Sequence, residues 1–271
     1  SFRDFNWINN IYSDLKKSIE YWENYRKNSN GLCVWMDGYE SGSDNNPATL
    51  WPAFTVEGVD LNCFLYREYI AFSIISEKLE KFDIQRIYIM KANSLEEVIN
   101  EKMWSTVDSS YYNLLSEGGT YTNYNNKSEN RIQTNTWTNF LPIWLGIAPE
   151  DKANRAIEKY LLNTEEFLGP FGLRSISKQE PCFNQESTIT PYSNYQGPVW
   201  IHVNYLLIHG LNNYGYTKEA LELVRTIEKL LVEDVEETGT MHEFYNSETG
   251  EGLGSTNFTG WNILFENIQE E

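Results

Sequence analysis

Residues 198–213, PVWIHVNYLLIHGLNN, predict a buried helix, and the rest of the chain can be read outward from it. Pro198 suits the first turn of this helix, and Gly215 lies just beyond its end. A further helix is expected directly afterwards, with Thr217 as its N-cap. One face of that second helix carries apolar residues at helical spacing: Ala220, Val224, Ile227 and Leu231. The sequence therefore predicts two successive helices in this region.

The same helical spacing of apolar residues recurs through much of the remaining sequence. Residues 5–27 carry Ile8, Ile11, Leu15 and Ile19 on this spacing. Similar patterns cover residues 57–81, 94–104, 136–147 and 150–162, and a last one follows Phe258. No alternating strand pattern continues for more than a few residues. We therefore expect an all-α protein, a single domain over residues 1–271, with about eight helices.

The segments between these helices are long, polar and rich in Gly, Asn, Ser and Tyr. They cover residues 28–56, 105–135, 164–197 and 235–257. Loops of this length in a compact domain are usually functional or disordered, and the Trp and Tyr residues in them argue against disorder. Paired helices whose loops gather at one end predict a helical toroid with a cleft among the loops.

Composition narrows the class of partner. The formal charge of -18 repels phosphate backbones and anionic membranes, so neither nucleic acid nor a membrane surface is an expected partner. No apolar run approaches the length of a membrane span. Aromatic residues make up 15% of the chain, which fits either a large core or a cleft that stacks aromatic rings on sugars.

Neither the cysteines nor the histidines match a metal site. Cys33, Cys63 and Cys182 are far apart and odd in number, so free and mostly buried thiols are expected, which favours a reducing compartment such as the cytoplasm. His202 and His209 could share a helix face, but no acid or Cys completes a ligand set. We expect no metal and no cofactor. The oxygen-rich loop 108–113 is a weak candidate for calcium.

Two loops about two hundred residues apart carry clustered carboxylates. They are residues 38–47, GYESGSDNNP, and residues 242–254, HEFYNSETGEGLG. A pair of carboxyl groups from distant loops is what glycoside cleavage requires, since one group protonates the leaving oxygen while the other activates water. Each acid could instead be an ordinary turn or surface residue. Within the two loops Glu40, Glu248 and Glu251 compete for either role.

Several motifs, in order along the chain, resemble glycoside hydrolase family 63. Residues 40–47, ESGSDNNP, resemble the ESGxDNSP motif of that family. The further matches are FLPIW at 140–144 with GIA at 146–148, GLRSIS at 172–177, GPVWI at 197–201 with NY at 204–205, and EFYN at 243–246 with ETGEGLG at 248–254. The resemblance implies the (α/α)6 barrel that this family shares with its trehalase relatives.

The resemblance also implies hydrolysis with inversion, in which Asp44 is the general acid and Glu243 the general base. Inverting enzymes hold the two carboxyl groups roughly 6.5–9.5 Å apart, which leaves room for the attacking water. The positions expected to bind substrate are Trp35, Tyr39, Glu40, Gly42, Trp51, Trp200, Asn204 and Trp261. Trp200 and Asn204 share a helix face at a spacing of four, so a core Trp with a capping Asn is an equal alternative for that pair.

Two departures from the family pattern bear on the substrate. Residues 195–197, Tyr-Gln-Gly, stand where relatives commonly have Trp-Arg-Gly, and Ala48-Thr49 replaces an Arg that often follows the Asp-Asn-Ser-Pro segment. The absence of two Arg side chains favours a neutral substrate such as an α-glucoside over an acidic glycosyl-glycerate.

A third departure concerns completeness. A closed (α/α)6 toroid needs twelve helices, whereas about eight are expected here, and an upstream Trp-Asp motif of the family is missing. The sequence therefore resembles the C-terminal part of a longer enzyme, whose N-terminal part is an expected partner. The alternatives are a non-catalytic carbohydrate-binding or scaffold protein on the same toroid, and an unrelated toroid enzyme such as a polysaccharide lyase.

Overall fold

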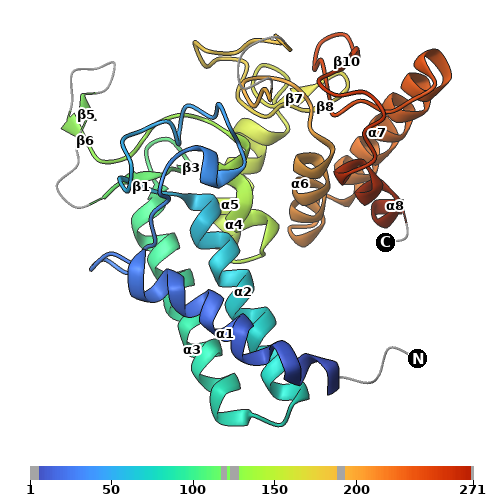
Figure 1. Cartoon of the computed structure of the whole chain (residues 1–271). Coiled ribbons are helices and arrows are strands. Elements are labelled where there is room, and N and C mark those ends of the chain that lie inside the picture. The colour runs from blue at the N-terminus through green and yellow to red at the C-terminus, as the bar shows by residue number, and fades with distance from the viewer. Residues whose placement is uncertain (1–5, 117–120, 123–127, 188–192, 270–271) are drawn as a thin grey trace.

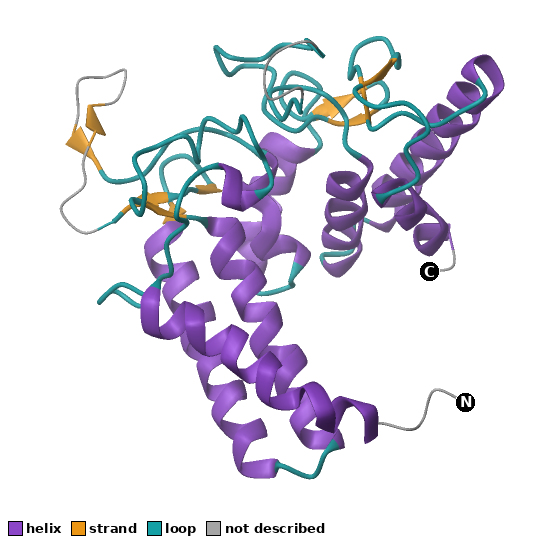
Figure 2. Ribbon diagram, in the orientation of Figure 1, coloured by secondary structure: helices purple, strands orange, loops and turns teal. Residues whose placement is uncertain are grey.

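The computed structural model describes residues 6–116, 121–122, 128–187 and 193–269, and it is mainly helical (Figures 1 and 2). Four helices form an inner row in which neighbours contact each other: α2 (Val59–Lys78), α4 (Leu141–Trp144), α6 (Ile201–Asn213) and α8 (Leu264–Gln269). Four others alternate with them along the chain: α1 (Asn6–Tyr25), α3 (Phe82–Val98), α5 (Glu150–Ala156) and α7 (Thr217–Thr238). The predicted all-α class is confirmed.

The helices of the second set lie outside the inner row. Helices α1 and α3 pack against α2, and α7 packs against α6 and α8. Helices α3 and α5 each continue into a π-helical turn, at Ile99–Met103 and Ile157–Leu161. The buried face of α7 includes Ala220, Ile227 and Leu231, as its apolar spacing predicts. Inner and outer helices thus alternate as a helical toroid requires.

Strands are short in the part of the chain that the structure describes. Each has two residues, and they form five antiparallel pairs. The pairs are β1 (Val56–Glu57) with β4 (Leu114–Leu115), β2 (Trp104–Ser105) with β3 (Ser110–Tyr111), β5 (Tyr121–Thr122) with β6 (Ser128–Glu129), β7 (Leu168–Gly169) with β8 (Gly172–Leu173), and β9 (Phe244–Tyr245) with β10 (Gly252–Leu253). Figure 2 shows these strands among the loops at one end of the helices, where the sequence predicts the cleft.

Two predicted helix starts in the C-terminal half of the chain are wrong. Helix α6 begins at Ile201, and Pro198 lies outside it, because Val199 is extended and pairs with both Arg174 and Tyr245. Thr217 is the first residue of α7, and the N-cap position belongs to Tyr216, with no side-chain capping bond. At the start of α6, the pairing of Val199 with distant residues overrides the local preference of Pro198 for the first turn of a helix.

The three cysteines are free thiols, as predicted: Cys33 and Cys63 are buried, and Cys182 is half-buried. Burial raises the pKa of Cys33 to about 12, so this thiol stays protonated. None of the described helices combines the length and apolar character that crossing a membrane demands.

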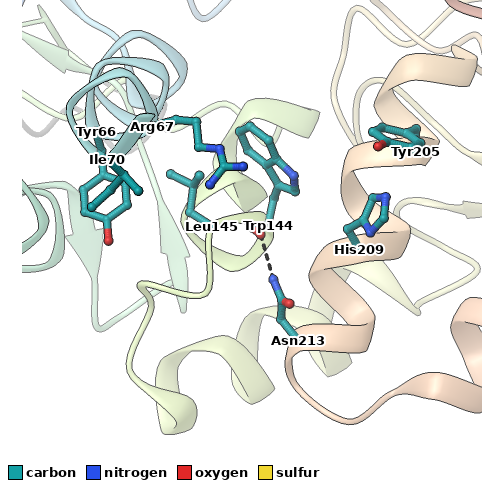
Figure 3. A pocket seen from close by; sticks show the side chains of 8 residues that line it. All are labelled: Tyr66, Arg67, Ile70, Trp144, Leu145, Tyr205, His209 and Asn213. Atoms are coloured by element: carbon teal, nitrogen blue, oxygen red, sulfur yellow. Dashed lines mark hydrogen bonds between the residues drawn. The ribbon is translucent and has the colours of Figure 1, made fainter. Parts of the chain in front are cut away.

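A cavity of about 490 Å³ lies between α2 and α6, beside α4 (Figure 3). Its walls are formed by Tyr66, Arg67, Ile70, Trp144, Leu145, Tyr205, His209 and Asn213. The Asn213 side chain donates a hydrogen bond of 2.7 Å to the backbone oxygen of Trp144, which ties α6 to α4. None of the site residues predicted from the sequence lines this cavity.

Candidate active site

Asp44 lies half-buried in the loop that follows the 3-10 turn Tyr39–Ser41. The next residue, Asn45, fixes this loop to residues 194–196. Its Oδ1 atom accepts the N–H of Tyr195 at 2.7 Å, and its Nδ2 donates to Oδ1 of Asn194 at 3.1 Å. The Gln196 side chain donates to the backbone oxygen of Asn45 at 2.8 Å. The position of Asp44 is therefore set by contacts far along the chain.

Glu243 lies half-buried directly before β9, with its backbone and its carboxylate both held. Its N–H donates to the oxygen of Ser255 at 3.0 Å, and the Ser255 N–H donates to Glu243 Oε2 at 3.1 Å. Gly254 has a φ of 73°, and a Cβ there would lie 2.5 Å from the Phe244 ring. Glycine is thus needed for the β9–β10 loop to fold back over Glu243.

Tyr195 connects the two carboxylates. Its backbone is bonded to the Asp44 loop through Asn45, and four residues later Val199 pairs with Tyr245 of β9 through bonds of 2.7 and 2.9 Å. The Tyr195 side chain is 4% exposed. Burial raises its pKa, and the negative charges of Asp44 and Glu243 both raise it further. The charges of the two predicted catalytic carboxylates therefore both influence the same phenol.

A layer of stacked rings supports Tyr195. Its ring lies parallel to that of Trp200, with centroids 4.1 Å apart, and Trp200 in turn stacks on Phe244 at 4.6 Å. The Tyr195 hydroxyl lies 3.4 Å from Nε2 of His202. Burial lowers the pKa of His202 to about 4, so this ring is neutral near pH 7. The layer that supports the site thus consists of aromatic rings and carries no charge.

Trp200 and Asn204 are placed within this support, against the expectation that they contact a sugar. Both are 0% exposed. The Trp200 indole N–H donates to the oxygen of Asn194 at 2.8 Å, and Asn204 bonds the N–H and the oxygen of Leu173. Neither side chain has a surface left for a ligand, so the alternative of a core Trp with a backbone-binding Asn describes them.

Trp35 and Glu40 also make contacts within the protein. The Trp35 indole is buried and donates to Oδ1 of Asp60 at 2.9 Å. Burial raises the pKa of Asp60 to about 6. The Glu40 carboxylate forms two bonds of 2.9 and 3.1 Å with the guanidinium of Arg26, and it accepts the N–H of Met36. These contacts make Glu40 a residue that shapes the Asp44 loop.

The remaining predicted contact positions keep exposed surface. Tyr39 is 62% exposed on the 3-10 turn, and Gly42 is exposed with a φ of 73° and open space around its Cα. Trp51 is half-buried against the cluster around Ala48. Trp261 is half-buried and donates from its indole N–H to the backbone oxygen of Glu243 at 3.2 Å. Its ring centroid lies 5.0 Å from that of His202, so Trp261 adjoins the site.

No cluster of three or more His, Cys, Asp or Glu side chains suited to a metal ion occurs among the residues described. In the weak calcium candidate, the Asp108 carboxylate accepts a bond from Ser105, and its backbone oxygen accepts bonds from Lys159 and Tyr160. A calcium site there remains a prediction.

Three residues that the sequence does not single out organise the site: Asn45, Tyr195 and His202. Asn45 stands inside the recognised motif, beside the acid, but its role depends on partners about 150 residues away. The sequence marks Tyr195 only as a departure from a family pattern, and His202 only as an incomplete metal ligand. The signal available in advance is the position of Tyr195 three residues before Pro198 in a recognised motif.

Comparison with known proteins places these observations in a family. A sequence model of the mannosylglycerate hydrolase MGH1-like glycoside hydrolase domain matches residues 3–261. The probable mannosyl-oligosaccharide glucosidase of Schizosaccharomyces pombe is 30% identical over 146 residues, which make up 50% of this chain and 18% of that protein. The chain spans 18% to 38% of the length of four curated relatives that it matches.

Two solved structures share the fold. The mannosylglycerate hydrolase of Thermus thermophilus, solved in complex with glucose, has a TM-score of 0.75 at 20% identity, over 98% of this chain and 70% of that one. The neutral trehalase of Saccharomyces cerevisiae has a TM-score of 0.62 at 18% identity, over 84% of this chain and 40% of that one. These likenesses confirm the predicted helical toroid. With the match over residues 3–261, the chain belongs to the mannosylglycerate hydrolase MGH1-like glycoside hydrolases, as its resemblance to glycoside hydrolase family 63 implied.

Proposed function

We propose that the protein hydrolyses an α-glucoside with inversion, with Asp44 as the general acid and Glu243 as the general base. The observation that carries this proposal is that residues 195–199 join the two loops, about two hundred residues apart: Tyr195 is bonded to Asn45, beside Asp44, and Val199 pairs with Tyr245, two residues after Glu243. A sugar bound between Asp44 and Glu243 would lie between a proton donor and a base that holds water. An inverting reaction needs that arrangement, with the two carboxyl groups roughly 6.5–9.5 Å apart.

The contacts of Glu243 suit a base. Its Oε2 atom accepts the Ser255 N–H, which fixes the plane of the carboxylate. Among the described residues, the hydrogen bond to the Glu243 carboxylate is made to Oε2 and not to Oε1. The other oxygen can therefore accept the proton of an attacking water.

The positions that lack Arg support a neutral substrate. Ala48 is 1% exposed and packs with Val56, Leu115 and Ile132 in a small apolar cluster. The Gln196 side chain donates to the backbone of Asn45 and accepts from Asn184 at 3.0 Å, so its amide is used within the protein. Neither position can offer a cation to a substrate carboxylate.

A second candidate substrate is mannosylglycerate, because both the matching family and the structural neighbour from Thermus thermophilus are named for it. The test compares initial rates of the full-length protein on mannosylglycerate and on neutral α-glucosides. Faster hydrolysis of the neutral glucosides supports the first candidate. A clear preference for mannosylglycerate would replace it with the second.

We also propose that the toroid is completed by the N-terminal part of the same protein. The chain supplies four inner and four outer helices among its described residues, whereas an (α/α)6 toroid has six of each. The inner row ends at α2 and α8, which contact α4 and α6 on one side, so a further helix pair would pack against these two end helices. Slower amide exchange of α2 and α8 in the full-length protein than in this chain alone is the expected result. Equal exchange would contradict it.

The catalytic assignment is tested by Asp44→Asn and Glu243→Gln in the full-length protein. Loss of α-glucoside hydrolysis with retained sugar binding in both variants supports it. Unchanged activity in both variants would contradict the assignment. A wild-type protein that binds sugar without hydrolysing it would favour the alternative of a non-catalytic sugar-binding protein. Proton NMR of the first anomer released tests inversion, for which an α-glucoside must give β-glucose.

A further inference from the structure

Asp234 lies in the last turn of α7 and is buried, with its side chain 4% exposed. A buried carboxylate is stable only when donors surround it. Here the donors are the N–H of His242 at 3.1 Å and its Nδ1 at 2.9 Å, the hydroxyl of Tyr245 at 2.9 Å, and the hydroxyl of Thr238 at 3.2 Å. The first three come from a single short segment of the chain.

That segment carries Glu243. His242 precedes it and Tyr245 follows it by two residues, so Asp234 holds the chain on both sides of the proposed base. The His242 N–H also lies 3.1 Å from the Tyr245 hydroxyl, which closes a ring of contacts around Asp234. On the opposite side, Ser255 and Trp261 hold the backbone of Glu243 itself. The Ser255 N–H also holds the Glu243 carboxylate, so contacts on both sides fix this residue.

The chemistry of this cluster calls for a carboxylate. An ionised Asp only accepts hydrogen bonds, and every partner of Asp234 named above is a donor toward it, so Nδ1 of His242 must carry its proton. An amide in the same place would turn an N–H₂ group toward one of those donors. Asn at position 234 therefore keeps the shape of the side chain but loses part of the contact with the Glu243 segment.

We propose that Asp234 is a positioning residue for Glu243. It clamps His242 and Tyr245 and so fixes the direction in which the Glu243 carboxylate enters the site. The inference rests on the proposed role of Glu243 as the base, and it assigns to α7, an outer helix, a part in catalysis.

The test uses kcat and KM of the full-length protein on α-glucosyl fluoride, expressed per folded molecule. Asp234→Asn should lower kcat by about 10- to 100-fold and leave KM within about threefold, because a shift of about 1 Å in a reacting group has an effect of this size. Tyr245→Phe removes one hydroxyl and should lower kcat by a smaller factor. The double variant should be no slower than Asp234→Asn, because both changes release the same clamp.

The matched control is Thr238→Val. It removes a donor to the same carboxylate, but from α7 itself and from an exposed side chain, so kcat should stay at the wild-type value. Wild-type kcat in Asp234→Asn, or an equal loss in Thr238→Val, would overturn the proposal. If Asp234→Asn fails to fold, unchanged kcat in Tyr245→Phe has the same meaning. Glu243→Gln, measured alongside, must be inactive: if it is fully active, the base itself is misassigned.

Discussion

The backbone N–H of Tyr195 donates a hydrogen bond of 2.7 Å to Oδ1 of Asn45, a residue 150 positions earlier in the chain. This bond joins the loop of the proposed acid to a buried tyrosine. Tyr195 then leads through Val199 to β9 and the proposed base. One side-chain amide therefore links the loop of the proposed acid to the segment that pairs with the strand of the proposed base.

Asn45→Ala should lower both stability and kcat. It leaves the buried Tyr195 N–H without its acceptor, which costs about 1–3 kcal/mol of unfolding free energy. We expect kcat to fall by about 10- to 100-fold as the acid moves relative to the base. Urea unfolding and steady-state kinetics measure the two effects. Asn45→Asp keeps the acceptor for Tyr195 and should retain more activity than the alanine variant. Equal losses in the two would contradict this role of Oδ1.

The helical class could be predicted from the sequence because the spacing of apolar residues is a local property. The spacing of apolar residues did not predict helix starts that depend on exposed apolar residues or on distant contacts. Helix α3 begins at Phe82, well before the predicted residue 94. The prediction missed its first turns because apolar side chains also occupy the exposed side of this helix: Phe82 is 53% exposed and Met90 is 71% exposed. Such residues blur the periodicity. The start of α6 was missed because Val199 pairs with Tyr245, a distant residue.

The site could be predicted only in part. Family motifs indicated Asp44 and Glu243, since motif matching identifies a position without needing its surroundings. Spacing placed Trp200 and Asn204 on one helix face, but it does not say whether that face meets a cavity or the core. The structure answers that question with full burial. The clamp at Asp234 gave no signal, because its partners join α7 to a separate loop.

The acid and the base should respond differently to the leaving group. Fluoride departs with little need for protonation, so Asp44→Asn should hydrolyse α-glucosyl fluoride within about tenfold of the wild type. On a disaccharide the same variant should lose about 10²- to 10⁴-fold. Glu243→Gln should lose activity on both substrates, since water must be activated in each case. Initial rates on the pair of substrates decide the matter. If Glu243→Gln retained activity on the fluoride and Asp44→Asn lost activity on both substrates, Glu243 would be the acid and Asp44 the base.

His202 should make stability depend on pH. Burial lowers its pKa to about 4 in the folded protein, below the ordinary value, so the unfolded chain binds more protons between these values. The contribution of the neutral ring is present above about pH 6.5 and is lost as the pH falls toward 4. Between pH 7 and pH 5 the loss is about 2 kcal/mol.

The comparison that isolates this effect is urea unfolding of wild type and His202→Gln at pH 7 and pH 5. Glutamine does not titrate, so the variant should lose less stability on acidification than the wild type, although it is less stable at pH 7. An identical loss in both proteins would show that other groups cause the pH dependence.

Arg174 should be the most sensitive cation in the protein to replacement by Lys. It is 2% exposed, and its guanidinium bonds Glu248 at 2.7 and 2.8 Å and the backbone oxygens of three loop residues, Thr164, Glu166 and Leu168. Burial acts to raise the pKa of Glu248, but the bonds from Arg174 and Lys178 outweigh it and lower that pKa. A Lys at position 174 has no planar fork and cannot reach all of these acceptors.

We therefore expect Arg174→Lys to lower the unfolding free energy by about 1–3 kcal/mol, because the charge is kept but buried backbone acceptors lose their donors. Lys178→Gln is the matched control, because Lys178 bonds the same Glu248 at 3.1 Å but is 39% exposed. Its loss should be at most about 1 kcal/mol, the range of surface ion pairs. Equal effects from the two variants in urea unfolding would mean that the charge of Glu248, and not the geometry of Arg174, holds the two loops together.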